Sequence, residues 1–219
     1  DACDRLRYAA LTDADLVAGD PDLKIDIVPN AEAKTLTIRD NGIGMNHDDL
    51  VENLGTIARS GTSKFVEQLS GDKSKDVNLI GQFGVGFYSA FMIADKVQVI
   101  SRKAGEDSAW LWESDGIGAY TITPAETDVR GTTITLYIKD DATEFLESAR
   151  LQTIIKTYSD HISVPIALHQ QVDGEDKTET VNQGSALWTR SKSDITEQQY
   201  KEFYHHTARA FDDPWMTLH

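Results

Sequence analysis

The sequence has only one cysteine, five prolines and a small share of basic residues. Cys3 cannot take part in an internal disulfide framework, which fits a reducing compartment. We expect Cys3 to be a small buried residue of a helix rather than a catalytic thiol, because no partner motif accompanies it. With 21 basic against 36 acidic residues the net charge is −15, which argues against a surface that follows nucleic-acid backbones.

Long hydrophobic runs are also missing. No stretch approaches the roughly 18 consecutive apolar residues of a membrane-spanning helix. Residues 1–5 lack the basic-then-apolar order of a signal peptide. Together with the acidic charge, these absences predict a cytoplasmic protein with no nucleic-acid partner and no membrane partner.

The composition is otherwise that of a globular protein with a core, since 40% of the residues are hydrophobic and 26% are charged. A chain of 219 residues allows one large domain, or one domain and part of a second. Apolar spacing predicts helices over 1–11, 46–54, 87–94, 141–158 and 196–208. Alternation predicts strands over 23–28, 34–39, 96–101, 109–113, 119–123, 132–138 and 162–168.

Local signals indicate how these elements begin and connect. Asn46 is expected to cap the second helix, and capping boxes are expected at 141–144 and 196–199. Pro29-Asn30 predicts the turn of the first hairpin, the strands from 96 to 138 predict an antiparallel meander, and Pro165 predicts an edge strand. Residues 170–184 are expected to be a loop.

The order of the elements decides the fold class. Strands come in groups, with helices between hairpins, and do not alternate strictly with helices. This order favours an α+β two-layer sandwich, a mostly antiparallel mixed sheet covered by helices, over a doubly wound parallel sheet. The aromatic tail after residue 187 predicts the start of a second domain.

The first candidate site is the acidic glycine turn Asp40-Asn41-Gly42-Ile43-Gly44-Met45. Most such turns are only turns. Here Asp40 follows a strand directly, Gly42 and Gly44 leave backbone bare where a ligand could approach, and Met45 offers a soft contact for a flat ring. The pattern therefore predicts a binding site for a nucleotide base.

The second candidate site is the glycine loop with Gly81, Gly84 and Gly86. Its G-x-x-G-x-G order reverses the dinucleotide fingerprint, and Phe87-Tyr88 stand where a Walker A motif needs Lys and Ser or Thr. A glycine loop that opens a helix nevertheless offers N–H groups to phosphate. The glycine-punctuated segment 55–80 before it predicts a functional lid.

Other kinds of site are poorly supported. The histidines have no cysteine or carboxylate partners at ligand spacing, so we expect no metal site built from side chains. A Gly-x-Ser-x-Gly nucleophile motif is absent, and Asp48-Asp49 is better explained as the acidic first turn of a helix.

The motifs Asp40-x-Gly42-x-Gly44, Gly81-x-x-Gly84-x-Gly86 and Gly131-Thr132 resemble the shared pattern of an ATPase superfamily. That superfamily contains DNA gyrase, heat-shock protein 90 chaperones, histidine kinases and mismatch-repair proteins. The longer stretches 53–58, 60–62 and 81–89 look like heat-shock protein 90, and 186–190 looks like its bacterial branch. The resemblance implies an ATP-binding domain over 1–178 that lacks its first strand and part of its first helix. A linker over 179–186 and the start of a middle domain over 187–219 would follow.

The resemblance also implies ligands and roles. ATP or ADP would bind with Mg²⁺ held through the phosphates. Asp40 would accept a hydrogen bond from the adenine amine with support from Thr132, Met45 would pack on the base, and Asn53 and Phe87 would contact ribose and phosphates. The whole set implied for ATP binding is Asp40, Gly44, Met45, Asn53, Arg59, Gly81, Gly84, Gly86, Phe87 and Thr132.

Two differences from the family pattern bear on catalysis. Arg59 stands where the family has Lys, so a forked guanidinium replaces a point charge. Asp1-Ala2 matches the pair that follows the family's water-activating Glu and magnesium-binding Asn, which places both before residue 1. We therefore expect no catalytic residue in this chain, weak nucleotide binding and near-zero turnover.

For the full-length protein, the resemblance implies a homodimer that hydrolyses ATP, closes its lid and acts on unfolded or partly folded client proteins. The alternatives are a gyrase-like ATPase subunit and a nucleotide-binding module without turnover.

Overall fold

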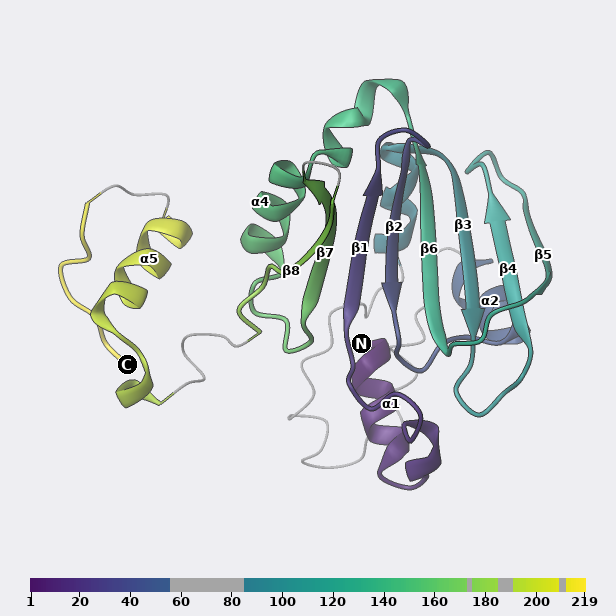
Figure 1. Ribbon diagram of the computed structural model, residues 1–219, viewed down its shortest axis with the longest axis horizontal. Helices are drawn as coiled ribbons and strands as arrows, with labels where there is room; N and C mark the ends of the chain where they lie inside the picture. Colours follow the sequence, from purple (N-terminus) through teal and green to yellow (C-terminus); the bar gives the residue numbers. More distant parts are fainter. Residues whose placement is uncertain (56–84, 173–174, 185–190, 209–211) are drawn as a thin grey trace.

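The computed structural model describes residues 1–55, 85–172, 175–184, 191–208 and 212–219 (Figure 1). Helices and 3-10 helices separate three groups of strands, β1–β2, β3–β6 and β7–β8. The helical elements are α1 (Ala2–Ala10), η1 (Ala14–Leu16), α2 (His47–Leu54), η3 (Gly86–Met92), η4 (Asp140–Leu146), α4 (Ser148–Tyr158), η6 (Lys192–Asp194) and α5 (Glu197–Ala208). The strands are β1 (Ile25–Asn30), β2 (Thr35–Asp40), β3 (Ala94–Arg102), β4 (Ala109–Ser114), β5 (Tyr120–Ala125), β6 (Gly131–Ile138), β7 (Ile166–Val172) and β8 (Glu175–Thr180).

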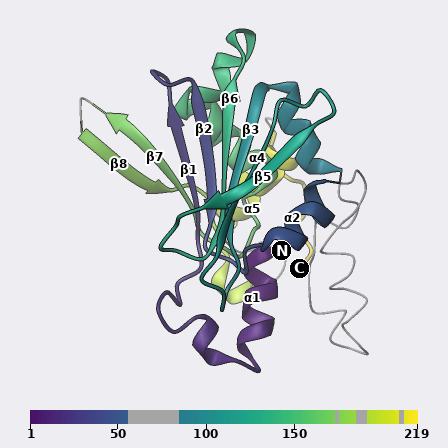
Figure 2. The ribbon, with the colours of Figure 1, turned by 90° about the vertical axis from the view of Figure 1, so that its right-hand side faces the viewer.

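The eight strands form one sheet in the order β5-β4-β3-β6-β2-β1-β7-β8. Every neighbouring pair is antiparallel except β1 and β7, which run parallel. Helix α2 lies behind β3 and β4 in Figure 1 and to the right of the strands in Figure 2, so helices cover one face of the sheet. The predicted fold class, an α+β two-layer arrangement with a mostly antiparallel mixed sheet, is confirmed.

The main core lies between that face and the helices. Inward-facing residues alternate along the strands, as Val97 and Val99 do in β3, and both are almost fully buried. Leu50 and Leu54 of α2 stand four residues apart, which places them on one apolar stripe against the sheet. Trp112 of β4 is the largest fully buried side chain of the described residues.

The strand predictions needed four corrections. The first hairpin turns at residues 31–34, because Pro29 and Asn30 extend β1. β6 inserts between β3 and β2, so only β3, β4 and β5 form a simple meander. β7 is an interior strand, with Pro165 just before it, and the expected loop over 170–184 contains the edge strand β8.

The chain stays tied to the sheet after β8. Asn182 is buried, and its Oδ1 accepts a hydrogen bond of 2.8 Å from the backbone N–H of Ile166. Its Nδ2 donates to the carbonyl oxygens of Ile162 and Val164, at 2.9 and 3.0 Å. The stretch expected as a linker, 179–186, therefore begins with residues that pair or hydrogen-bond within the sheet.

The helix predictions were right where caps form. Asn46 and Asp49 make a reciprocal capping box at α2, and the backbone N–H of Thr196 donates to the Gln199 side chain before α5. Among the described helices, none is long and apolar enough to cross a bilayer.

Two helix predictions were wrong. The residues from Phe87 form the 3-10 helix η3, and Ala94 already begins β3. The helix expected over 141–158 is two elements, because Glu147 is extended between η4 and α4, and no side chain caps η4. A capping-box pattern therefore did not guarantee the cap.

Cys3 is buried in α1, as predicted. Burial and the nearby negative charge of Asp40 raise the pKa of the Cys3 thiol to about 11. The thiol is therefore neutral at physiological pH, which suits a packing role and not a nucleophilic one.

On the open face of the sheet, a polar cluster joins β1 to β7 and β8. The Asp26 carboxylate is buried and lies 2.8 Å from Nε2 of His169 and 3.1 Å from Nζ of Lys24. Thr178 Oγ1 lies 3.1 Å from the other ring nitrogen of His169. Burial alone would raise the pKa of Asp26, but the hydrogen bonds from His169 and Lys24 outweigh burial and lower it.

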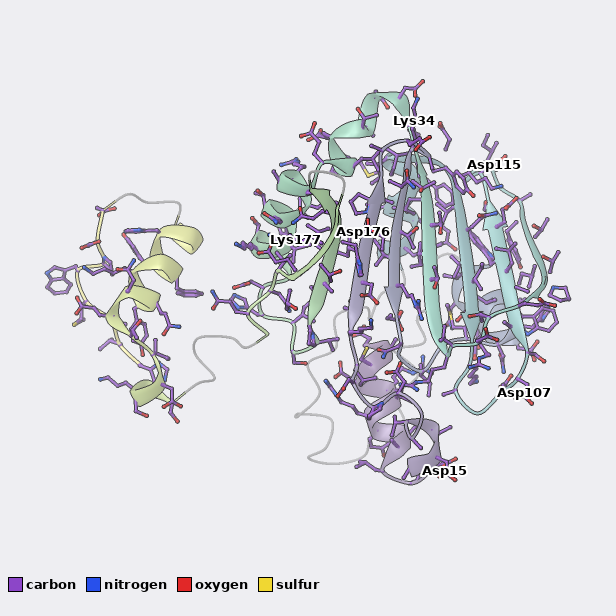
Figure 3. All side chains as sticks on the ribbon, viewed as in Figure 1. Asp15, Lys34, Asp107, Asp115, Asp176 and Lys177 are labelled. Atoms are coloured by element: carbon purple, nitrogen blue, oxygen red, sulfur yellow. The ribbon has the colours of Figure 1, made fainter. Side chains whose placement is uncertain are left out.

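We predict a pH-dependent cost for Asp26→Asn. Because the folded-state pKa of Asp26 is lowered, its carboxylate stabilises the fold above the ordinary carboxyl pKa near 4, and this contribution is lost as the pH falls through the folded value. Urea denaturation should show the variant less stable than the parent at pH 7, with the difference shrinking at pH 3. The control is Asp107→Asn, which changes an exposed carboxylate at the end of the β3–β4 turn (Figure 3). An equal loss of stability at pH 7 and pH 3 would contradict the stabilising role of the charged Asp26 carboxylate.

Candidate functional site

The site begins where β2 ends. Asp40 is the last residue of β2, opposite Thr132 of β6 and Ile25 of β1. Thr132 in turn lies opposite Ser101 of β3. Residues directly opposite in antiparallel strands point to the same face, so Asp40, Thr132 and Ser101 form a polar row across three neighbouring strands.

This polar row lies on the helix-covered face. One row further along the same face are Ile38, Ile134 and Val99, two residues away in each strand, and they are apolar members or neighbours of the main core. An inward-facing polar row at the end of an apolar face needs polar partners. It therefore marks the place where this face can receive a polar ligand.

The Asp40 carboxylate lies where burial disfavours its charged form. Its side chain is half-buried, and burial raises its pKa, although the Gly42 N–H and the charge of Arg39 partly oppose the shift. Oδ1 accepts the Gly42 N–H at 2.9 Å, and within the described residues no further donor reaches the carboxylate. A carboxylate with this remaining acceptor capacity suits a ligand that brings an N–H donor.

Asn41 holds Asp40 in place, although the sequence pattern singled it out only as a turn residue. It is almost fully buried. Its Oδ1 accepts the Lys24 N–H at 2.8 Å, and its Nδ2 donates to the Asp20 carboxylate at 2.8 Å and to the Asp22 carbonyl at 2.9 Å. All but one of its side-chain hydrogen-bonding positions are used, so the amide fastens the end of β2 to the segment before β1.

The two glycines of the turn are needed for protein packing. A Cβ on Gly42 would lie 2.7 Å from the carbonyl carbon of Ala2 in α1. Gly44 has φ of +67°, and a Cβ there would collide with the carbonyl oxygen of Arg102 at the end of β3. The sequence predicted that the backbone at Gly42 and Gly44 is open to a ligand. In the structure, α1 and β3 of the chain itself lie against it.

Met45 and Asn53 complete one side of this site. The backbone N–H of Met45 donates to Ser101 Oγ at 2.8 Å, and the Met45 side chain packs against the main core. Asn53 of α2 has its Nδ2 3.9 Å from the Met45 sulfur. Five of the predicted residues are thus linked through the loop and the polar row: Asp40, Gly44, Met45, Asn53 and Thr132.

Gly86 and Phe87 belong to η3. Gly86 is exposed, and a Cβ there would meet no atom within 4 Å, so nothing in the described packing requires glycine at this position. The Phe87 ring packs edge-on against Trp112, with ring centroids 5.4 Å apart. Arg59, Gly81 and Gly84, and nearly all of the expected lid, lie outside the described residues.

The structure also has a cavity of about 470 Å³ away from these residues. Residues of 13–20, 102–107 and 128–130 line it, and Asp40, Met45, Asn53 and Thr132 are not among them. The cavity is therefore distinct from the polar row. No group of three or more His, Cys, Asp or Glu side chains in the described ranges could hold a metal ion.

Comparison with known proteins identifies the family. Residues 11–142 match the family model described as histidine kinase-, DNA gyrase B-, and HSP90-like ATPase, and residues 170–219 match the model of Hsp90 protein. The chain is 60% identical to the chaperone protein HtpG of Paramagnetospirillum magneticum and 54% identical to that of Roseobacter denitrificans. It is 56% identical to the chaperone protein HtpG of Rickettsia rickettsii.

These alignments cover all of this chain but only 34–35% of each relative. The chain thus spans about a third of the length of the curated relatives it matches. The first family model alone covers more than half of the chain. The chain therefore belongs to the histidine kinase-, DNA gyrase B- and HSP90-like ATPases, and among them to the heat-shock protein 90 family.

Proposed function

We propose that this chain is the ATP-binding part of an ATP-dependent chaperone and that Asp40 and Thr132 of the polar row receive the adenine base. The observation that carries the proposal is the Asp40 carboxylate, half-buried with a raised pKa and with only the Gly42 N–H donating to it among the described residues. An exocyclic amine would supply the missing donor. The names of the relatives, which are chaperone proteins, support the same reading.

Each remaining residue has a role that its position supports. Met45 is proposed to pack on the face of the base, and Thr132 to hydrogen-bond beside Asp40. Asn53, next to Met45, faces the ribose and phosphates in this proposal. The open side of Gly86 leaves the start of η3 accessible to phosphate, with Phe87 beside it.

Arg59, Gly81 and Gly84 are proposed to contact the phosphates as well, on the strength of the family resemblance alone. Mg²⁺ would be held through phosphate oxygens, where it would neutralise charge on the transferring group. ADP would bind the same site.

For the whole protein, we propose that ATP hydrolysis drives the folding of unfolded or partly folded client proteins, in a cytoplasmic homodimer. We also propose that the ATP-binding domain, expected over 1–178, continues to Asn182, because the Asn182 hydrogen bonds hold that residue to the sheet. Residues 187–219 would begin the next domain.

Asp40→Asn should separate binding from stability. The amide can still accept the Gly42 N–H, but it presents a mixed donor and acceptor to the adenine amine, so ADP affinity should fall by about 10- to 100-fold. Because the pKa of Asp40 is raised in the folded state, its ionisation costs stability above pH 4, and the ligand-free variant should be at least as stable as the parent at pH 7.

Calorimetric titration with ADP and thermal unfolding without ligand measure the two effects. Asp107→Asn is again the matched control, since that carboxylate is exposed and lies outside the proposed site. Unchanged ADP affinity in Asp40→Asn would remove Asp40 from the site.

Gly44→Ala should weaken the fold. The new Cβ meets the Arg102 carbonyl oxygen, and alanine is strained at φ of +67°, so the free energy of unfolding should fall by about 2 kcal/mol or more. Gly19→Ala is the matched control, because a Cβ at Gly19 meets nothing within 4 Å and its φ is not positive. Denaturation curves that place the two variants at equal stability would contradict the close approach of the turn to β3.

A further inference from the structure

Ser101 is the most deeply buried member of the polar row, and no nucleotide contact is proposed for it. It is the residue before the last in β3, with a relative exposure of 0%. Within the described part of the chain, three groups lie within hydrogen-bonding distance of its Oγ: the Met45 N–H at 2.8 Å, the Gly131 carbonyl oxygen at 3.0 Å and Thr132 Oγ1 at 2.9 Å. These groups come from the β2–α2 turn and from β6, so one hydroxyl joins two sides of the site.

The three contacts of Ser101 Oγ can coexist in one arrangement of the protons. A serine hydroxyl has one proton and two acceptor positions. The Met45 amide can only donate and occupies one acceptor position, and the Gly131 carbonyl can only accept and takes the Ser101 proton. The remaining contact is then a hydrogen bond donated by the Thr132 hydroxyl. In this arrangement the whole capacity of Ser101 is used, and Thr132 Oγ1 is left as an acceptor.

The alternative arrangement has a different consequence for a ligand. If Ser101 gives its proton to Thr132, the hydrogen bond to the Gly131 carbonyl is lost and the Thr132 hydroxyl becomes free to donate elsewhere. Ser101 therefore controls which hydrogen-bonding character Thr132 presents beside Asp40. The first arrangement is favoured because it makes all three hydrogen bonds of Ser101, and an unmade hydrogen bond in the interior costs free energy.

The same residue also determines the position of Met45. Gly44 lies against the Arg102 carbonyl, and Met45 donates to Ser101, so two successive residues of the turn are held by two successive residues of β3. The second of these links is a single hydrogen bond to a side chain. Removing the Ser101 hydroxyl would leave the partly buried Met45 amide without its acceptor.

We propose that Ser101 is a positioning residue of the adenine-binding site. By holding the Met45 amide and the Thr132 hydroxyl together, it sets the spacing between the group that packs on the base and the groups that read its edge. This inference rests on the proposed function, since it concerns the same site. Ser101 does not contact the nucleotide in this arrangement and acts through Met45 and Thr132.

The matched test compares Ser101→Thr with Ser101→Val. Threonine and valine have nearly the same shape, so both add the same bulk, but only threonine keeps the hydroxyl. We expect Ser101→Thr to bind ADP within about threefold of the parent and Ser101→Val to bind about tenfold more weakly, as loss of one buried hydrogen bond predicts. Equal affinities of the two variants would overturn the proposal.

Two further measurements distinguish positioning from mere stabilisation. Hydrogen exchange at the Met45 amide should be faster in Ser101→Val than in Ser101→Thr, without ligand. In a double-mutant cycle with Thr132→Val, the losses in ADP affinity should be less than additive, because both substitutions break the same network. Additive losses with an unchanged Met45 amide would show a purely structural effect and would also overturn the proposal.

The outcomes also separate this proposal from the proposed function. If the parent chain fails to bind ADP, the proposed function fails, while Met45 exchange still tests the role of Ser101 in the turn. If added bulk prevents folding of both variants, Ser101→Ala removes the oxygen without adding atoms. The same faster Met45 exchange is then expected, and unchanged exchange would contradict the network.

Discussion

The structure depends most on the backbone contact between the β2–α2 turn and the end of β3. Gly44 can lie against the Arg102 carbonyl oxygen only because it has no Cβ and adopts a positive φ. This contact brings the Met45 amide to Ser101, directs the start of α2 and leaves Asp40 at the rim of the sheet. Side-chain bonds around it, above all those of Asn41, secure an arrangement that the backbone approach makes possible.

Local features of the fold were readable from the sequence, while the pairing of distant strands was not. The cap of α2 by Asn46 was predicted because an N-cap acts within one helical turn and depends on nearby residues alone, whereas the reciprocal bond from Asp49 was not predicted. The insertion of β6 and the interior position of β7 depend on partners up to about 140 residues away, for which alternation within a strand carries no information. Pro165 was misleading because its missing N–H falls just before the strand and not inside the ladder.

The candidate site shows the same division. Asp40 was singled out because a carboxylate at the end of a strand stands beside two glycines and Met45, and its role toward adenine came from the family resemblance. Ser101 and Asn41 were missed, because serine in a strand and asparagine before glycine are ordinary in surface positions. A signal for Ser101 was present in the alternation, since Val97, Val99 and Ser101 continue one inward-facing series. A polar residue at the next inward position of such a series indicates a buried polar contact.

The parallel pairing of β1 with β7 has a consequence for the synthesis of the chain. Residues 25–27 pair with residues 166–168, so β1 gains its second neighbour only after most of the domain has been translated. At ordinary rates of synthesis, the interval between the two strands lasts on the order of ten seconds. During that time β1 and β2 can already form their hairpin, but the outer edge of β1 stays unpaired and open to other chains. A protein of a chaperone family thus passes through a stage in which one edge of its own nascent sheet is unpaired.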